Sequence, residues 1–193
     1  MMRKSWAAIV VLVVCSATVM AAENGTRLLR FPDIHGDSVV FCYGGDLWTA
    51  SVDGGATRRL TAHPGQEVFP RFSPDGEWIA FRANERLQKI SVKGGAAVTL
   101  CYTQRTRGIN WNENGGIIFA AMWGGLSRVA PQGGPPELLT RLEGTETSHR
   151  WPQVLPGGEE VLFTADVGGS LSEANIVVQR IGGSERRVVW VGV

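Results

Sequence analysis

The three histidines of this sequence, His35, His63 and His149, are its first candidates for acid–base chemistry. A nucleophilic triad needs a hydroxyl beside such an imidazole and an acid behind it. Each histidine lies in a turn or link between apolar segments, and the sequence has no Gly-x-Ser-x-Gly segment that would present a nucleophile. We therefore expect no catalytic residue, and histidines that hydrogen-bond loop backbone groups.

Alternating polar residues at Asp33, His35 and Asp37 raise the possibility of a metal site, because carboxylates and imidazoles are common metal ligands. In a turn, such residues more often cap backbone amides. We expect the capping role here, with no metal and no cofactor.

Aromatic and basic side chains recur at regular positions. Trp48, Trp78, Trp111 and Trp151 could form a binding platform, but their repetition favours packing in the core. The arginine pairs 58–59 and 186–187 lie in polar segments, which we interpret as solvated outer strands. None of these patterns identifies a ligand-binding residue.

Composition excludes several classes of partner. The chain has 193 residues, of which 44% are hydrophobic and 19% charged, as in a globular domain. Its net charge is +1 and its basic residues are scattered, so neither nucleic acid nor a membrane surface is indicated as a partner. Twenty-five glycines, many of them in pairs, indicate an all-β chain with many tight turns.

The segment 1–22 has the pattern of an export signal. Arg3 and Lys4 precede an apolar run, and Ala21 and Ala22 offer small residues for cleavage. An uncleaved anchor is the alternative, although the run is short for the roughly 20 residues of a spanning helix. We expect a periplasmic or secreted protein without stable membrane insertion after cleavage.

The expected chemical state of the three cysteines depends on whether this export signal is cleaved. Cys15 belongs to the apolar run, and the bulky residues before it disfavour a lipid-modified cysteine. Cys42 and Cys101 could form a disulfide in an oxidising compartment. Each ends an apolar segment, however, and we favour two buried thiols.

The stretch from Phe69 to Phe81 reveals how the chain is built. Its Pro74-Asp75-Gly76 turn joins two apolar strands, and the second strand is apolar on both faces, so it must be covered from both sides. Looser versions of this unit recur, and each ends in a glycine doublet. The doublets begin at Gly54, Gly94, Gly133 and Gly182, about 40 to 50 residues apart.

This period predicts an all-β fold, a β-propeller of four-stranded blades. The propeller spans 23–193, with about four blades at approximately 28–61, 69–101, 107–141 and 148–190. A β-sandwich is the alternative, but it does not require units that recur in a fixed order. Four blades are few for a ring. We expect an incomplete or truncated propeller, either part of a larger one or a short form that self-associates through open blade edges.

Two families share these motifs. The segments Phe31–Asp37, Gly45–Trp48, Arg59–Thr61 and Pro70–Phe81 resemble the N-terminal propeller of tricorn-type proteases over roughly residues 28–100. Over roughly 105–190, Ser148–Gln153 and Phe163–Ala165 are similar to repeats of the periplasmic Tol-system protein and of sensor kinases.

The resemblance implies a propeller that gates or delivers peptide to a separate catalytic domain, which these residues do not include. We therefore expect a non-catalytic, exported binding module for a protein or peptide. The alternative is the substrate-gating portion of a tricorn-like serine peptidase.

Overall fold

The computed structural model describes residues 28–168 and 171–192. Within these ranges the regular secondary structure consists of strands and one 3-10 helix, η1 (Leu171–Glu173). The predicted export signal and Cys15 lie outside the described residues. No helix in 28–168 or 171–192 combines the length and apolar character needed to cross a membrane.

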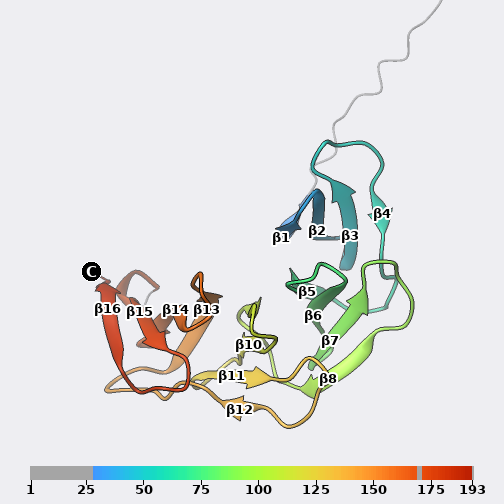
Figure 1. Ribbon diagram of the computed structural model, residues 1–193. Helices are drawn as coiled ribbons and strands as arrows, with labels where there is room; N and C mark the ends of the chain where they lie inside the picture. The colour runs from blue at the N-terminus through green and yellow to red at the C-terminus, as the bar shows by residue number, and fades with distance from the viewer. Residues whose placement is uncertain (1–27, 169–170, 193) are drawn as a thin grey trace, which may run out of the picture.

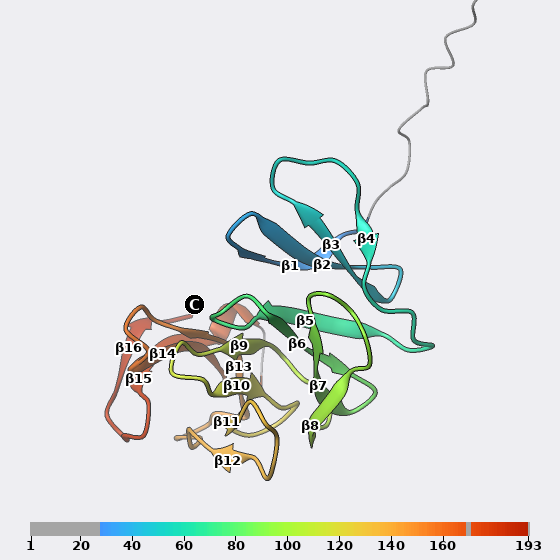
Figure 2. The ribbon, with the colours of Figure 1, turned by 45° about the vertical axis from the view of Figure 1, so that its right-hand side comes forward.

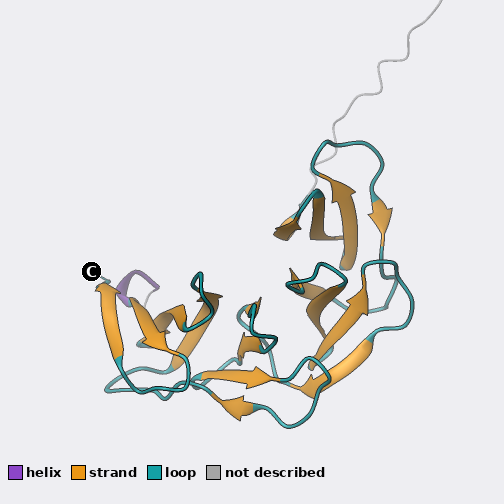
Figure 3. Cartoon of the chain, viewed as in Figure 1, coloured by secondary structure: helices purple, strands orange, loops and turns teal. Residues whose placement is uncertain are grey.

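In this described part, sixteen strands form four antiparallel sheets, each made of four consecutive strands (Figure 3). Blade 1 contains β1 (Arg30–His35), β2 (Ser38–Tyr43), β3 (Asp46–Ser51) and β4 (Arg58–Arg59). Blade 2 contains β5 (Glu67–Phe72), β6 (Trp78–Ala83), β7 (Arg86–Ser91) and β8 (Val98–Tyr102). Blade 3 contains β9 (Ile109–Trp111), β10 (Ile117–Ala120), β11 (Leu126–Val129) and β12 (Glu137–Leu138). Blade 4 contains β13 (Ser148–Val154), β14 (Glu160–Asp166), β15 (Asn175–Arg180) and β16 (Arg186–Trp190).

The blades follow one another along an open arc (Figure 1). The first strands line its inner side, where β1 contacts β5, β5 contacts β9, and β9 contacts β13. The rotated view in Figure 2 shows the same order, with blade 1 at one end and blade 4 at the other. The predicted all-β propeller architecture is confirmed.

The four glycine doublets that begin at Gly54, Gly94, Gly133 and Gly182 join the third and fourth strands of their blades, as the repeat predicts. Gly133 shows why glycine is required. Its φ is 89°, in the left-handed region, and a Cβ there would lie 2.8 Å from the carbonyl oxygen of Leu100 in blade 2. This turn therefore packs directly against the preceding blade.

The core is divided into three clusters, one for each pair of neighbouring blades. Strand β6 contributes to two of them, because Ile79 and Phe81 pack toward blade 1 whereas Ala80 packs toward blade 3. All three side chains are fully buried. The prediction of a strand covered on both faces is confirmed.

Three inner strands carry a bulge that the sequence pattern did not predict. Phe31, Phe69 and Trp151, each followed by proline, have φ values of 53°, 57° and 50°, and the pairing register shifts at each. Phe31 and Phe69 pack against each other with ring centroids 4.2 Å apart. In blade 3 the corresponding residue is Gly108, which leaves room for the backbone of Trp151.

Both described cysteines are free and buried, as predicted. Cys42 lies in the cluster between blades 1 and 2, and Cys101 in the cluster between blades 2 and 3. Burial raises the pKa of Cys42 to about 12 and that of Cys101 to about 11. Both therefore serve as small core residues in the protonated form.

Candidate functional site

Two of the three histidines lie where the sequence predicts. His35 ends β1, and its Nε2 donates to the carbonyl oxygen of Pro74, 3.0 Å away in the turn of blade 2. His63 lies in the link between blades 1 and 2, where its Nδ1 is 3.5 Å from the side-chain amide of Asn84. Loop contacts therefore account for His35, whereas His63 contacts a side chain.

The prediction that His149 lies in a link is wrong. His149 is fully buried within β13. Its Nδ1 lies 2.7 Å from the hydroxyl of Thr140, and its Nε2 donates to Glu146 at 3.0 Å. This hydroxyl–imidazole–carboxylate order is that of a nucleophilic triad. The Thr140 hydroxyl is also buried and already accepts from the amide of Leu126 at 2.7 Å, so no substrate can reach it. The arrangement joins blades 3 and 4.

In this buried cluster of Thr140, His149 and Glu146, the electrostatic environment favours a neutral imidazole at His149 and a charged carboxylate at Glu146. Burial lowers the pKa of His149, and the opposing attraction of Glu146 does not offset it. Burial alone would raise the pKa of Glu146, but hydrogen bonds from Arg186 and His149 outweigh it and lower that pKa. Arg186 also pairs with Glu143 at 3.1 Å. The prediction of Arg186 as a solvated edge residue was therefore wrong.

Blades 1 and 2 are joined at the equivalent position by different chemistry. Thr61, like Thr140, follows the fourth strand of its blade and accepts the amide of a buried leucine, Leu47, at 2.9 Å. Its hydroxyl bonds to the buried carboxylate of Glu67, which stands in β5 where His149 stands in β13. Burial raises the pKa of Glu67. These two side chains are structural links between blades.

The segment considered for metal binding also connects blades. Asp33 accepts the backbone amide of Phe72 at 2.8 Å and lies 3.6 Å from the guanidinium of Arg71. The predicted capping role therefore fits Asp33, although the amide belongs to the next blade. Among residues 28–168 and 171–192, no three His, Cys, Asp or Glu residues gather as a metal site.

The tryptophans do not share one role. Trp111 packs against the core between blades 2 and 3, in line with the prediction, and Trp78 lies under the ammonium of Lys89 at 4.4 Å. Trp48 contacts Tyr43 at one end of the arc. Trp151 is 46% exposed in blade 4, so the prediction that it packs in the core is wrong.

Three of the four predicted edge arginines do lie on exposed strands. Arg58 donates to the carbonyl of Lys93 in blade 2 at 3.3 Å. Arg59 pairs with Asp46 at 2.6 Å, and Arg187 pairs with Glu160 at 3.3 Å.

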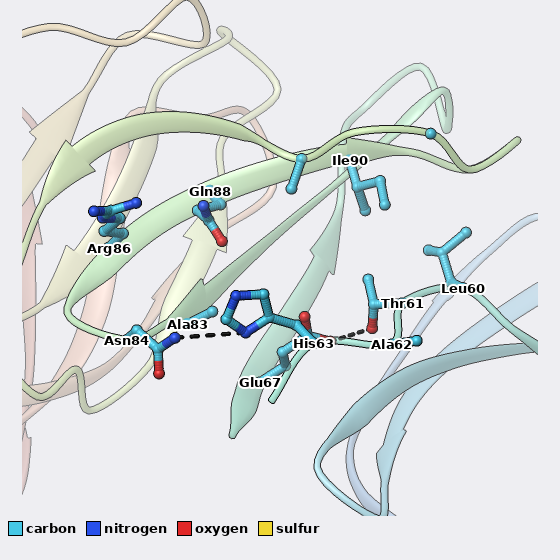
Figure 4. A pocket seen from close by; sticks show the side chains of 12 residues that line it. Leu60, Thr61, Ala62, His63, Glu67, Ala83, Asn84, Arg86, Gln88 and Ile90 are labelled. Atoms are coloured by element: carbon cyan, nitrogen blue, oxygen red, sulfur yellow. Dashed lines mark hydrogen bonds between the residues drawn. The ribbon is translucent and has the colours of Figure 1, made fainter. Parts of the chain in front are cut away.

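The best candidate for a binding site is a hollow beside the tip of the β6–β7 hairpin (Figure 4). It has a volume of about 600 Å³ and lies between the segment that follows β4 of blade 1 and, in blade 2, β7 with the turn after it. Its polar walls include His63, Asn84, Arg86 and Gln88, with Glu67 at the blade junction. Asn84 also lines a second hollow of about 450 Å³, on the side of the hairpin that faces blade 3.

The charge in these two hollows is unbalanced. Arg82 and Arg105 line the second hollow, and Arg86 lines the first. None of these three forms an ion pair within the described part of the chain, and Nε of Arg82 is buried without an acceptor. The single acid among the lining residues, Glu67, already accepts hydrogen bonds from Thr61 and the amide of Leu47. The hairpin tip therefore presents free donors suited to a carboxylate.

Sequence reasoning missed this group of arginines because they look scattered along the chain. Arg82 and Arg86 flank the Asn84-Glu85 turn, and both turn residues have positive φ, which is typical of a two-residue hairpin. That spacing was a usable signal. Arg105 joins the group only through the packing of blade 3 on blade 2.

Comparisons with known proteins agree with the fold. The family model of the tricorn protease N-terminal β-propeller domain matches residues 26–128, more than half of the chain. Tricorn protease homolog 1 of Streptomyces coelicolor is 32% identical over 124 residues, and the tricorn protease of Thermoplasma acidophilum is 44% identical over 56 residues. The matches cover 58% and 29% of this chain, but only 12% and 5% of those proteins.

A solved structure extends the likeness beyond the part matched in sequence. TolB from Acinetobacter baumannii superposes with a TM-score of 0.72 and 13% identity, over 86% of this chain and 44% of TolB. This likeness concerns the fold, and it includes the C-terminal blades.

Proposed function

Because this chain belongs to the tricorn protease N-terminal β-propeller family, we propose that it acts as a non-catalytic binding module for a carboxylate-bearing peptide or protein segment. The observation that carries this proposal is the group of unpaired arginines at the β6–β7 hairpin, above all the buried Nε of Arg82. Arg82 is half-buried, and a buried guanidinium nitrogen without an acceptor costs free energy, which a carboxylate bound at this side chain would offset. The predicted export signal supports binding outside the cytoplasm.

The surroundings of Arg82 suit an extended ligand. Asn84 stands between the two hollows, so one peptide could cross the hairpin tip and contact both. Arg86 and Gln88 follow along β7, a strand held on both sides by β6 and β8. Rigid strands therefore position the donors, which limits the entropy lost on binding.

A peptide-binding assay tests the proposal. We expect a glutamate-rich fluorescent peptide to bind the full chain, and its glutamine counterpart to bind at least about tenfold more weakly, since a charge-assisted hydrogen bond contributes about 1.5–3 kcal/mol. R82Q should weaken binding of the acidic peptide about tenfold and leave the glutamine peptide unaffected. Comparing free and amidated C-termini separates a terminal carboxylate from side-chain carboxylates.

The matched control is R141Q, which removes the same charge from an exposed arginine outside both hollows. It should bind the acidic peptide like the unaltered chain. Equal binding of the two peptides, or equal effects of R82Q and R141Q, would rule out the proposed site.

The second candidate function is the substrate-gating propeller of a tricorn-like peptidase. It is favoured by the relatives, which are named tricorn proteases and of which this chain matches 12% or less in the two cases above. In that case the acidic segment would be a passing substrate. Sequencing the gene beyond the codon for Val193 distinguishes the two functions, because a peptidase domain in frame would favour gating.

A further inference from the structure

The two ends of the arc expose faces that every other blade buries. In each blade one face turns toward the following blade, here called the forward face, and the other toward the preceding blade, the backward face. The three core clusters are forward faces of blades 1, 2 and 3 packed on backward faces of blades 2, 3 and 4. The forward face of blade 4 and the backward face of blade 1 have no such neighbour within the described residues.

The forward face of blade 4 is built like its buried equivalents. Strand register places Leu162 at the position of Val40, Ala80 and Ile118, all fully buried in the three interfaces. Leu162 keeps the apolar character but is only partly buried.

Further positions on this face are also apolar where the equivalent residues of other blades are buried. Ile176 stands where the buried Leu47 and Leu87 stand in blades 1 and 2. Val189 takes the place of the buried Leu100 at the bulge of the fourth strand, yet is 51% exposed. Blade 4 therefore carries the side chains of an interface that it does not make.

The backward face of blade 1 carries the apolar positions of the other side of such an interface. Ile34, which is 62% exposed, occupies the position of the buried Phe72 of blade 2. Val39 and Phe41 likewise correspond to the fully buried Ile79 and Phe81, but remain partly exposed.

Charge complementarity points to a second copy as the occupant. In the interface between blades 1 and 2, Arg58 of the outer strand donates to the carbonyl of Lys93, at the turn after β7. In blade 4 the residue in the position of Arg58 is Arg187, and in blade 1 the residue in the position of Lys93 is Asp53. An incoming blade 1 would therefore bring the backbone carbonyl of an acidic residue, instead of that of a lysine, to Arg187, which also pairs with Glu160 of its own blade at 3.3 Å.

We propose that this chain self-associates head to tail, with the forward face of blade 4 packing on the backward face of blade 1 of a second copy. The contact repeats an interface that the chain already makes three times within itself. It is heterologous, because two different surfaces meet, and the assembly keeps one free surface at each end until a ring closes. This inference does not depend on the proposed peptide site, which lies at blades 1, 2 and 3.

Sedimentation velocity over a range of concentrations tests the proposal on the full chain. We expect the unaltered protein to grow in mass with concentration. V189D blocks the forward face of blade 4, and I34D blocks the backward face of blade 1, so each variant alone should be monomeric. Mixed together, they should form a one-to-one dimer and nothing larger, since one unblocked face of each kind remains.

L138D is the matched control, because Leu138 is exposed on β12 away from both faces, and it should assemble like the unaltered chain. Circular dichroism should show that all variants stay folded, since the altered side chains are largely exposed. A monomer at every concentration would overturn the proposal, as would single-face variants that still assemble. A mixture of V189D and I34D that stays monomeric would likewise exclude the head-to-tail contact.

Discussion

Individual side chains join the blades of this protein at two equivalent points, and the two points differ in how they titrate. Thr61 is held by the carboxylate of Glu67, and Thr140 by the imidazole of His149. Burial raises the pKa of Glu67, so the folded state favours the protonated carboxyl as pH falls, whereas burial lowers the pKa of His149, so the folded state resists protonation of the imidazole. Acidification should therefore weaken the junction of blades 3 and 4.

The pKa of His149 is lowered, and the sign of its effect on stability follows directly. The folded state favours neutral imidazole, so this contribution is present above the unfolded pKa of about 6.5 and is lost as pH falls toward the folded pKa. The lowered pKa of Glu146 adds to the loss at more acidic pH. We expect H149N to flatten the fall in the free energy of unfolding between pH 7 and about pH 5.

Urea unfolding across this pH range measures the effect. H63N is the control, because His63 is exposed and its contact with Asn84 is long. A pH dependence as steep in H149N as in the unaltered chain would show that His149 does not titrate on unfolding.

At the scale of the element, the turn between the third and fourth strands decides how closely successive blades approach. Gly133 and Gly182 begin two such turns with similar φ values of 89° and 80°. They differ in surroundings, because a Cβ on Gly133 meets the backbone of Leu100 at 2.8 Å, whereas a Cβ on Gly182 meets nothing within 4 Å.

This pair separates backbone strain from steric contact. G182A should cost about 1–2 kcal/mol of unfolding free energy, the penalty for an L-residue in the left-handed region. G133A should cost more, by at least about 1 kcal/mol, because blade 3 must also move away from Leu100. Chemical denaturation of both variants gives the difference, and equal losses would mean that blade contact at Gly133 contributes nothing.

At this scale, the sequence repeats made most of the fold predictable, but they did not predict the candidate site. Strand alternation and the glycine doublets predicted four-stranded sheets because both depend on local chain geometry. The bulges at Phe31, Phe69 and Trp151 require positive φ at aromatic residues, which local propensity disfavours. Likewise, Arg105 approaches Arg82 only after two blades have packed together.

For the whole molecule, the arc makes stability depend on position. Among residues 28–168 and 171–192, each blade contacts its neighbours in the sequence, so blades 2 and 3 are covered on both faces and blades 1 and 4 on one. In such a linear array, local opening costs least at the ends.

Hydrogen exchange at low protein concentration tests this expectation. Amides of β6, in blade 2, should exchange more slowly than those of β2 and β14, the second strands of the terminal blades. If association covers the terminal faces, protection of β2 and β14 should rise with concentration while that of β6 stays constant. Uniform protection of all three strands at every concentration would show that the arc unfolds as one unit.

The connectivity of the sheets has a consequence for the history of the gene. Every sheet in the described part of the chain is formed by four consecutive strands, and no strand there is exchanged between distant blades. Duplication or loss of about 40 codons would thus add or remove one complete sheet together with one copy of each packing surface. Recombination between repeats can lengthen or shorten this protein without cutting through any hydrogen-bonded ladder.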